Sequence, residues 1–494
     1  MDKYYNVIGG ERRESSTGER FENRNPANWD EVIGTFPRSN EEDVNTAVES
    51  ARSAFNNWRL VPAPKRGEII KKVGDILSGR KEEIARLMTR EMGKVLDETR
   101  GDVQEGIDTA YYAASEGRRL FGHNAPSELP NKMNISFRQP IGVAGIISPW
   151  NFPMAIPTWK IFPALVCGNC VVFKPASDTP ATAAVFVDIL LEAGIPPKVV
   201  NIVHGTGNGV GIPIVNHPDI NIISFTGSSK VGKTIAEAGG RQLKRISLEL
   251  GGKNAQIVMD DAYIDLALDG VLWGAFGTTG QRCTATSRLI LHEAIYDEFM
   301  DKLLKRTQAL KLGNGLNEEV QVGPLINEGQ RNVVEKYVEI GKKEGAKILC
   351  GGEHETDGEC AKGFFYKPTI FGDVTPGMTI AQEEIFGPVL SVIKINSLDE
   401  AISALNDSIY GLSSSIYTQD VNAAFRAMRD IEAGITYING PTIGAECHMP
   451  FGGVKETGNG HREGGWEVYE FFSETKTVYV DFSGKLQRAQ IDNR

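Results

Sequence analysis

The sequence predicts an α/β fold with mostly parallel sheets, and three observations lead to this prediction. Between residues 166 and 259, short apolar runs alternate with helical stretches. A second alternation of the same kind follows Gly251. The chain has 494 residues, of which 41% are hydrophobic, and this is enough apolar material for a large folded core. Sheets of this kind bind ligands at the carboxyl ends of their strands.

The first third of the chain is predicted to be largely helical. Apolar residues recur at helical spacing from Val44 to Phe55 and again from Ile69 to Leu77. The stretch from Gln139 to Trp159 carries no charge, but it contains four prolines. Because a lipid-exposed helix would not tolerate so many breaks, we expect this stretch to be buried core rather than a membrane span.

Strands and helices are expected to alternate through the middle of the chain. The first series has expected strands at residues 170–173, 199–204, 222–225, 246–250 and 255–259, and helices from Thr179–Pro180 to Ala193 and from about Lys230 to Ala238. The second series has an expected helix from about Ile264 to Phe276, a strand at Ser287–His292 and a long helix to about Leu310. Lys476–Asp481 alternates like an edge strand, and we place a domain boundary near Gly251–Gly252.

Composition argues against several classes of protein. Lys and Arg total 53 and Asp and Glu total 64, so the net charge of −11 disfavours a partner such as nucleic acid or an anionic membrane. The polar N-terminus predicts no secretory signal. Six cysteines in so long a chain do not suggest a disulfide scaffold, and we expect a cytoplasmic protein. Cys167 and Cys170 lie in an apolar run, which favours core packing, and we predict no metal site.

The segment Phe225–Gly232 is a candidate phosphate site. The usual G-x-G-x-x-G fingerprint is absent, but this segment follows an expected strand and opens an expected helix, so free backbone N–H groups could meet a pyrophosphate. Gly227 would permit close backbone approach. The alternative is an ordinary turn in which Ser228 caps the helix.

Three side chains are candidates for chemistry. Cys283 lies in a polar loop, where Arg282 or amide dipoles would lower the thiol pKa; the alternative is a buried structural cysteine. Glu249 ends an apolar strand, where desolvation would raise its pKa and suit it as a general base; the alternative is an ion pair with a lysine such as Lys253. Glu384 stands beside an aromatic residue and a turn, and the alternative there is a solvated loop.

Seven short segments together resemble the motifs of the aldehyde dehydrogenase superfamily, in the family's order. They are Pro149–Pro153, Phe173–Pro175, Phe225–Ser228, Glu249–Lys253, Gly280–Cys283, Glu383–Pro388 and Pro450–Gly453. Because the match runs over essentially the whole chain, it outweighs the alternatives given for the single motifs. The resemblance implies oxidation of an aldehyde to the carboxylic acid with NAD or NADP, through a covalent cysteine intermediate.

The resemblance also implies catalytic roles for four residues. Cys283 would attack the aldehyde carbon and form a thiohemiacetal. The side-chain amide of Asn151 and the backbone N–H of the cysteine would hold the oxyanion. After hydride transfer, Glu249 would activate the water that hydrolyses the thioester. Glu474 matches, by its position near the C-terminus, a carboxylate with a role in proton relay.

Further residues match the family's cofactor contacts. These are Gly227, Ser228 and Gly232 at the pyrophosphate and helix, Trp150 and Lys174 on the adenosine side, Glu384 at the nicotinamide ribose, and Phe386 and Leu250 nearby. Many NAD-preferring members carry Glu three residues after the lysine, whereas this chain has Ser177. Because Ser177 and Lys174 could bind a 2′-phosphate that a carboxylate would repel, we expect NADP to be accepted, alone or alongside NAD.

The family fold implies three parts. They are a Rossmann-like cofactor domain (residues 1–122 and 141–251), an α/β catalytic domain (252–468) and a small bridging β element (123–140 and 469–494). In the family the bridging element pairs subunits, so a homodimer or homotetramer is expected.

Rival functions and the substrate follow from the same residues. Glu249 disfavours a CoA-acylating enzyme, Cys283 and Asn151 disfavour a non-catalytic structural protein, and the cofactor motifs make a purely hydrolytic enzyme secondary. The segment Gly280–Ser287 resembles that of 2-oxoglutarate semialdehyde dehydrogenases, and Ser177 resembles succinic semialdehyde dehydrogenases. Either substrate would need a cation for its distal carboxylate. Long-chain, retinal-like and aromatic aldehydes and betaine aldehyde stay open.

Overall fold

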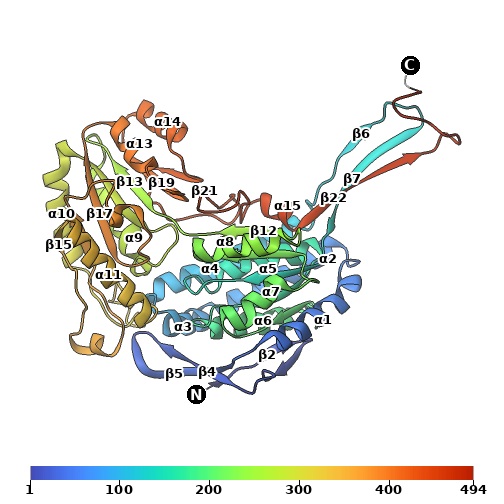
Figure 1. Cartoon of the computed structure of the whole chain (residues 1–494), viewed down its shortest axis with the longest axis horizontal. Helices are drawn as coiled ribbons and strands as arrows, with labels where there is room; N and C mark the ends of the chain where they lie inside the picture. Colours follow the sequence, from blue (N-terminus) through green and yellow to red (C-terminus); the bar gives the residue numbers. More distant parts are fainter. Residues whose placement is uncertain (1, 493–494) are drawn as a thin grey trace.

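Residues 2–492 are described by the computed structural model, which has two α/β lobes and a projecting arm (Figure 1). Each lobe is built on a seven-stranded sheet, and the arm is a three-stranded sheet that points away from both lobes. The mixed α/β class with mostly parallel strands agrees with the sequence prediction.

The sheet of the first lobe has the spatial order β12-β11-β8-β9-β10-β2-β3. Its strands are β12 (Arg245–Glu249), β11 (Ile222–Thr226), β8 (Val143–Ile147), β9 (Cys170–Lys174), β10 (Val200–Ile202), β2 (Asn6–Ile8) and β3 (Glu11–Arg13). The first five are parallel, and β2 and β3 are antiparallel additions. Thr226 and Glu249 are partners at the carboxyl ends of β11 and β12, so both reach the same edge of the sheet.

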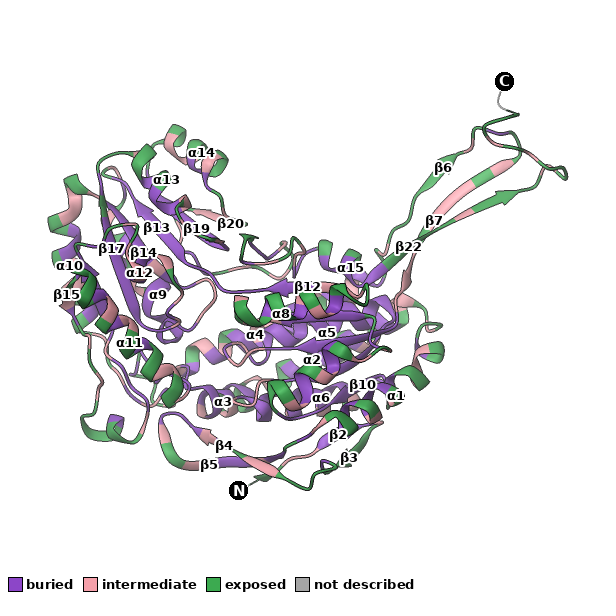
Figure 2. Ribbon diagram, viewed as in Figure 1, coloured by how far each residue is buried: buried purple, intermediate pink, exposed green. Residues whose placement is uncertain are grey.

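Eight helices belong to the first lobe. They are α1 (Glu41–Trp58), α2 (Ala63–Gly79), α3 (Lys81–Met92), α4 (Leu96–Glu116), α5 (Ala155–Cys167), α6 (Pro180–Ala193), α7 (Ile212–Asn216) and α8 (Ser229–Gly240). Every residue of α5 is buried, and Figure 2 shows the buried interior of this lobe in purple. Most of the charge-free stretch therefore lies in the core, as expected. Within residues 2–492 no helix is long and apolar enough to cross a membrane.

The sheet of the second lobe has the order β15-β16-β17-β14-β13-β19-β20. Its strands are β15 (Lys347–Cys350), β16 (Thr369–Gly372), β17 (Val389–Ile395), β14 (Thr286–His292), β13 (Asn254–Val258), β19 (Ser413–Tyr417) and β20 (Ile435–Ile438); its helices are α9 (Ile264–Phe276), α10 (Tyr296–Gln308), α11 (Glu328–Glu344), α12 (Thr379–Gln382), α13 (Leu398–Asn406) and α14 (Val421–Asp430). The strand expected at 255–259 had been counted with the first series, and this was wrong. Its partners β14 and β19 come later in the chain, so local pattern could not place it.

The arm consists of β6 (Asn124–Pro126), β7 (Lys132–Pro140) and β22 (Ser473–Asp481). β22 pairs antiparallel with β7 along its whole length, from Ser473 opposite Pro140 to Asp481 opposite Lys132. The order β22-β7-β6 leaves β22 with a neighbour on one side only. This confirms the prediction of a terminal edge strand, and the short helix α15 (Glu467–Phe471) leads into it.

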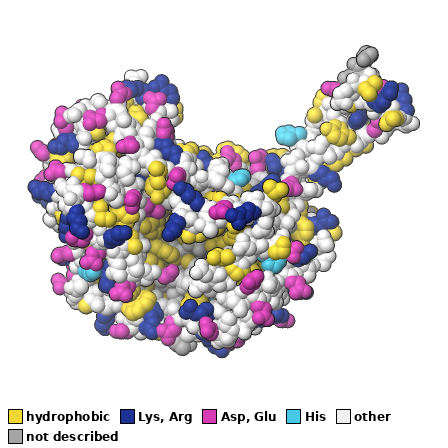
Figure 3. Space-filling view, viewed as in Figure 1, with side chains coloured by type: hydrophobic (Ala, Val, Ile, Leu, Met, Phe, Trp, Pro, Cys, Tyr) yellow, Lys and Arg dark blue, Asp and Glu magenta, His cyan; other side chains and the backbone are white. Residues whose placement is uncertain are grey.

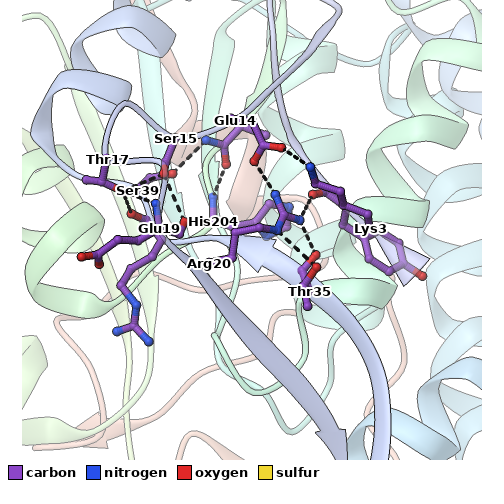
Figure 4. A network of polar contacts seen from close by, with 12 residues as sticks. Lys3, Glu14, Ser15, Thr17, Glu19, Arg20, Thr35, Ser39 and His204 are labelled. Atoms are coloured by element: carbon purple, nitrogen blue, oxygen red, sulfur yellow. Dashed lines mark hydrogen bonds and ion pairs between the residues drawn. The ribbon is translucent and has the colours of Figure 1, made fainter. Parts of the chain in front are cut away.

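A small N-terminal sheet was not expected from the sequence. It contains β1 (Asp2–Lys3), β5 (Asn28–Pro37) and β4 (Arg20–Asn25), and a two-stranded sheet of β18 (Tyr410–Gly411) and β21 (Val454–Lys455) lies elsewhere. Polar contacts join the first of these sheets (Figure 4): Lys3 pairs with Glu14 at 2.7 Å, and Arg20 pairs with Glu14 and donates to the Thr35 carbonyl at 2.6 Å. Because β4 is rich in polar residues, it gives little apolar alternation.

Candidate active site

A cavity of about 420 Å³ contains residues from both lobes. Its walls include Cys283, Glu249, Glu463, Trp159, Phe451 and Arg282. In Figure 3 hydrophobic side chains gather in a hollow between the lobes, with charged side chains around it. The structure thus brings two of the four predicted catalytic residues, Cys283 and Glu249, to one apolar-walled space.

Cys283 stands in a tightly fixed loop between α9 and β14. Thr278 and Thr279 adopt left-handed backbone conformations, with φ of 53° and 57°. A Cβ on Gly280 would lie 2.1 Å from the carbonyl oxygen of Gly387, so only glycine fits there. The carbonyl oxygen of Cys283 itself accepts a hydrogen bond from Asn254 Nδ2 at 2.7 Å. The loop therefore holds the thiol in one position.

The electrostatic setting of Cys283 differs from the sequence expectation. Burial, together with Glu384 and Glu249, raises the pKa of the thiol to about 12. Arg282 does not lower it, because the guanidinium donates to Glu98 Oε1 at 2.9 Å and to Thr278 Oγ1 at 2.8 Å. A nucleophilic thiolate at this position needs a base that takes the thiol proton.

Asn151 is buried beside the same loop. Its side-chain Nδ2 donates to the carbonyl oxygen of Gln281 at 3.1 Å. The Gln281 side chain is in turn fixed, because its Oε1 accepts from the backbone N–H of Ile326 at 2.9 Å. The amide predicted to hold an oxyanion is thus anchored two residues from Cys283.

Glu249 is the last residue of β12 and is buried. Neither of its carboxylate oxygens has a hydrogen-bond partner among the residues described. Burial, and repulsion by Glu463, raise its pKa well above the ordinary value. Lys253 is not its partner, since Lys253 Nζ is also without a hydrogen bond in the described chain. A desolvated carboxyl of this kind fits a general base.

The sequence did not identify Glu463, which lies in the cavity wall near Glu249. Its carboxylate forms a buried ion pair with Lys160 of α5, and Lys160 Nζ also donates to Ser224 Oγ at 3.0 Å. Lys160 did carry a signal, because it is the one charged residue of a largely apolar helix and therefore requires a buried partner. Nothing in the sequence around Glu463 indicates its role.

Glu474 lies elsewhere. It sits on β22 with its side chain 49% exposed, 3.9 Å from Arg245, and it is not part of the cavity wall. The structure therefore does not bring the predicted relay carboxylate near Cys283 or Glu249. Glu463 occupies such a position instead. The two glutamates are eleven residues apart in the chain, but only Glu463 lies before the arm begins.

The turn from β11 into α8 has the geometry expected of a phosphate site. Ser228 Oγ caps α8 by accepting from the Val231 N–H at 3.4 Å. A Cβ on Gly232 would lie 2.4 Å from Leu250 Cδ2, and one on Gly227 would lie 2.5 Å from the Phe225 ring. Both glycines therefore allow close packing at the positive end of a helix of 12 residues.

Glu384, Phe386 and Trp150 lie on the neighbouring loops. The rings of Trp150 and Phe386 meet edge to face, with centroids 5.3 Å apart. Glu384 Oε1 accepts from the Gly252 N–H at 3.0 Å, and burial raises the pKa of this carboxyl to about 7. A Cβ on Gly251 would lie 2.3 Å from Glu384 Oε2, so this glutamate packs tightly against the connection between the lobes.

Lys174 and Ser177 follow β9. Lys174 is 5% exposed, its Nζ donates to the Pro175 carbonyl at 2.8 Å, and burial lowers its pKa to about 8. Ser177 Oγ donates to the Gly205 carbonyl at 2.9 Å. Each side chain thus bonds to the backbone and not to a carboxylate.

Known proteins resemble this chain over nearly its full length. The aldehyde dehydrogenase family profile matches residues 13–478. The α-ketoglutaric semialdehyde dehydrogenase of Bacillus subtilis is 44% identical over 97% of this chain and 98% of its own, and the 2,5-dioxopentanoate dehydrogenase of Saccharolobus solfataricus is 41% identical over 94% and 96%. The crystal structure of an NAD-dependent aldehyde dehydrogenase from Sinorhizobium meliloti superposes with a TM-score of 0.95 at 36% identity, covering 98% of this chain and 96% of that one. This chain belongs to the aldehyde dehydrogenase family.

Proposed function

We propose that this aldehyde dehydrogenase oxidises an aldehyde that carries a distal carboxylate, 2,5-dioxopentanoate, and that Cys283 is its nucleophile. The observation that carries the catalytic assignment is the cavity shared by Cys283, Glu249 and Glu463. As a member of its family the enzyme oxidises aldehydes with NAD⁺. The CoA-acylating alternative is not favoured.

The first chemical step in this proposal is activation of Cys283. Its thiol proton passes to Glu249, whose raised pKa makes it a competent acceptor in the dry cavity. The sulfur attacks the aldehyde carbon, and the carbonyl oxygen becomes an oxyanion on a thiohemiacetal. The Asn151 amide and the Cys283 backbone N–H donate to this oxygen. Losing one such donor typically slows turnover about 10²- to 10³-fold.

The second step is hydrolysis of the thioester. Glu249 first passes on the proton that it took from Cys283; it then takes a proton from water, whose oxygen attacks the thioester carbon, and the sulfur leaves as thiolate. Glu249 must then lose its proton. The neighbouring Glu463 and Lys160 offer a buried path for that proton, which is the relay role first given to Glu474.

The residues at the β11–α8 turn fit a dinucleotide. Gly227 and Gly232 leave no room for side chains there, and the helix end is capped only by Ser228. Gly227, Ser228, Gly232, Trp150, Lys174, Leu250, Glu384 and Phe386 would hold it. When bound, NAD⁺ supplies the hydride acceptor. We keep the proposal that NADP is also accepted, because position 177 itself carries a serine and no carboxylate, although Asp178 lies near Lys174.

The substrate assignment is supported by the names of two relatives and by Arg282. The relatives from Bacillus subtilis and Saccharolobus solfataricus are named for this semialdehyde. Arg282 supplies the cation that a distal carboxylate needs, and among the described residues of the cavity wall it is the only Lys or Arg.

A second candidate is betaine aldehyde. Four aromatic side chains, Phe152, Trp159, Trp273 and Phe451, line the cavity and would suit a quaternary ammonium group. The betaine aldehyde dehydrogenase of Bacillus subtilis is 40% identical over 92% of this chain.

The proposal also covers the oligomeric state of the enzyme and its place in the cell. The free edge of β22 and the exposed Tyr479 and Phe482 of the arm favour a homodimer or homotetramer, in which another subunit protects the edge. The chain would work in the cytoplasm, where its six free thiols stay reduced.

The test is a kcat/KM panel with 2,5-dioxopentanoate, succinic semialdehyde, pentanal, benzaldehyde and betaine aldehyde, each with NAD⁺ and NADP⁺. We expect 2,5-dioxopentanoate to rank first and Cys283→Ala to abolish turnover. Retained activity in Cys283→Ala would refute the assignment of Cys283 as the nucleophile. If betaine aldehyde ranked above 2,5-dioxopentanoate, betaine aldehyde would become the proposed substrate. If Ser177→Glu left kcat/KM with NADP⁺ unchanged, the proposal that Ser177 allows NADP⁺ to bind would be wrong.

A further inference from the structure

Glu105 on α4 is a cavity residue with no role in the chemistry above. It lines the cavity of Cys283, and it also lines a shallower hollow that includes Cys447 and His448. The side chain is partly buried, and its Oε1 atom is shielded from solvent without a hydrogen-bond partner in the described chain. Because an unpaired buried oxygen is costly, its position in a substrate cavity points to a ligand that completes it.

The charges around Glu105 influence whether its carboxyl group is protonated. Asp102 and Asp108 lie on the same helix, and the surrounding elements bring Lys94, Arg282, Tyr437, Glu446, Cys447 and His448. Burial, reinforced by Asp102, raises the pKa of Glu105 to about 8 in spite of Lys94 and Arg282. At neutral pH the carboxyl is therefore protonated and offers an O–H donor.

Three of the acids near Glu105 have a cationic partner, whereas among the described residues Asp108 accepts only from Gln104 Nε2, at 2.9 Å, and Glu446 lies 3.5 Å from His448. Asp102 pairs with Lys94 at 2.9 Å, and Asp97 pairs with Arg100 at 2.9 Å. Glu98 pairs with Arg282. These pairs offset part of the negative charge around Glu105, but the charge of Arg282 is shared with Glu98, so binding of an anion there depends on a neutral Glu105.

Arg282 provides the second contact. Its Nε and Nη2 atoms are used by Thr278 and Glu98, but Nη1 makes no hydrogen bond within residues 2–492. Arg282 is close enough to Glu105 to affect its ionisation. A free guanidinium N–H and the shielded carboxyl of Glu105 therefore belong to the wall of one cavity.

We propose that Glu105 is a specificity-determining residue that donates a hydrogen bond to the distal carboxylate of an acidic aldehyde, opposite Arg282. This inference rests on the proposed substrate class. A hydrogen bond from a neutral acid to a carboxylate is short and strong, whereas ionised Glu105 would repel the same ligand. An aldehyde without a distal charge gains nothing from this contact.

The experiment compares kcat/KM for 2,5-dioxopentanoate with kcat/KM for pentanal, at saturating NAD⁺ from pH 6.5 to 9.5. Their ratio cancels the titration of Cys283 and Glu249, which both substrates share. The enzymes are the wild type, Glu105→Gln, Glu105→Ala and, as a matched control, Asp108→Asn. Asp108 is an exposed acid one turn along α4 that lies outside the main cavity.

In the wild type we expect the ratio to fall about tenfold per pH unit above pH 8, as Glu105 ionises. Glu105→Gln keeps a neutral N–H donor, so its ratio stays high and becomes independent of pH. Glu105→Ala lowers the ratio at pH 7 by about tenfold or more, the usual effect of losing a bond to a charged group. Asp108→Asn keeps the shape of the wild-type profile, with the fall moved slightly to lower pH because Asp108 helps to raise the pKa of Glu105.

Three results would overturn the inference. One is a ratio in Glu105→Ala within twofold of the wild type at pH 7. Another is a Glu105→Gln profile parallel to that of the wild type. A third is an Asp108→Asn profile that matches Glu105→Gln, which would indicate a general charge effect. A wild-type ratio of one or less at pH 7 would instead refute the proposed substrate, and the inference with it.

Discussion

Two buried lysines lie near the cavity, and the surroundings of their carboxylate partners differ. Lys160 pairs with Glu463, which faces Glu249 in the cavity wall. Lys94 pairs with Asp102 at 2.9 Å, and the other oxygen of Asp102 accepts from the Ala155 N–H at 2.7 Å, where α5 begins. Both pairs are almost completely shielded from solvent. The Asp102 pair ties α4 to α5, although Asp102 also lines the cavity near Glu105, whereas the Glu463 pair adjoins the proposed proton acceptor Glu249.

The comparison teaches that burial alone does not reveal the role of an ion pair. In these two pairs the further neighbours differ: Asp102 also accepts from a backbone N–H, which fits an anchor, and Glu463 lies near the titratable Glu249, which fits proton transfer. Substitutions in both ion pairs test whether one anchors the fold and the other takes part in proton transfer.

The largest effect is expected from Asp102→Ala. This change leaves Lys94 buried without its partner and removes the acceptor at the start of α5, so the free energy of unfolding should fall by about 3–5 kcal/mol. Urea unfolding followed by circular dichroism measures it. A loss below about 1 kcal/mol would mean that the pair is not an anchor.

Glu463→Gln should act on turnover. Glutamine still accepts from Lys160 but cannot carry a proton, so we expect kcat to fall about 10- to 100-fold, with a smaller change in KM. Asp102→Asn is the matched isosteric control and should change kcat less than threefold, about 0.7 kcal/mol in activation free energy. Equal losses of kcat in both variants would remove the distinction between the two pairs.

A third buried carboxylate, Glu91, has no lysine partner. It accepts from the Thr182 N–H at 2.9 Å and from the Thr182 hydroxyl at 2.7 Å, at the start of α6, and burial raises its pKa to about 7. Because its folded pKa lies above the unfolded value, its contribution to stability is present at acidic pH and is lost as pH rises through 7. The free energy of unfolding should fall by about 1–3 kcal/mol between pH 6 and 8. Glu91→Gln should flatten this slope, and an unchanged slope would contradict the assignment.

The smallest effect is expected from Glu474→Gln. The exposed contact with Arg245 contributes less than about 1 kcal/mol, so monomer stability should barely change. If kcat also stays within twofold of the wild type, a steady-state assay confirms that Glu474 is outside the proton path. A loss as large as that of Glu463→Gln would restore the original assignment.

Local pattern predicted much of the fold. The β11–α8 turn, α9 and the terminal edge strand all have contiguous signals, either helical spacing or alternation. The N-terminal hairpin of β4 and β5 was missed because polar residues dominate β4. The strand β13 was assigned to the wrong sheet because both of its partners come later in the chain.

The sequence identified some residues of the candidate site and not others. Cys283, Glu249 and Asn151 sit in distinctive motifs, and the structure places them close to one loop or cavity. Glu463 and Glu474 could not be ranked from sequence, since each is one glutamate near the C-terminus. Their difference arises from a contact with Lys160 across 303 residues, which only the folded chain reveals.

The link between the lobes has a consequence for catalysis. Glu249 ends the last strand of the first sheet, Asn254 begins the second and holds the Cys283 carbonyl, and residues 250–253 connect the two strands. Glu384 is wedged against Gly251 in that link. A twist of one lobe against the other would therefore separate proton acceptor from sulfur, and contacts between the lobes, such as Arg282 with Glu98 and Asn151 with Gln281, oppose such a twist.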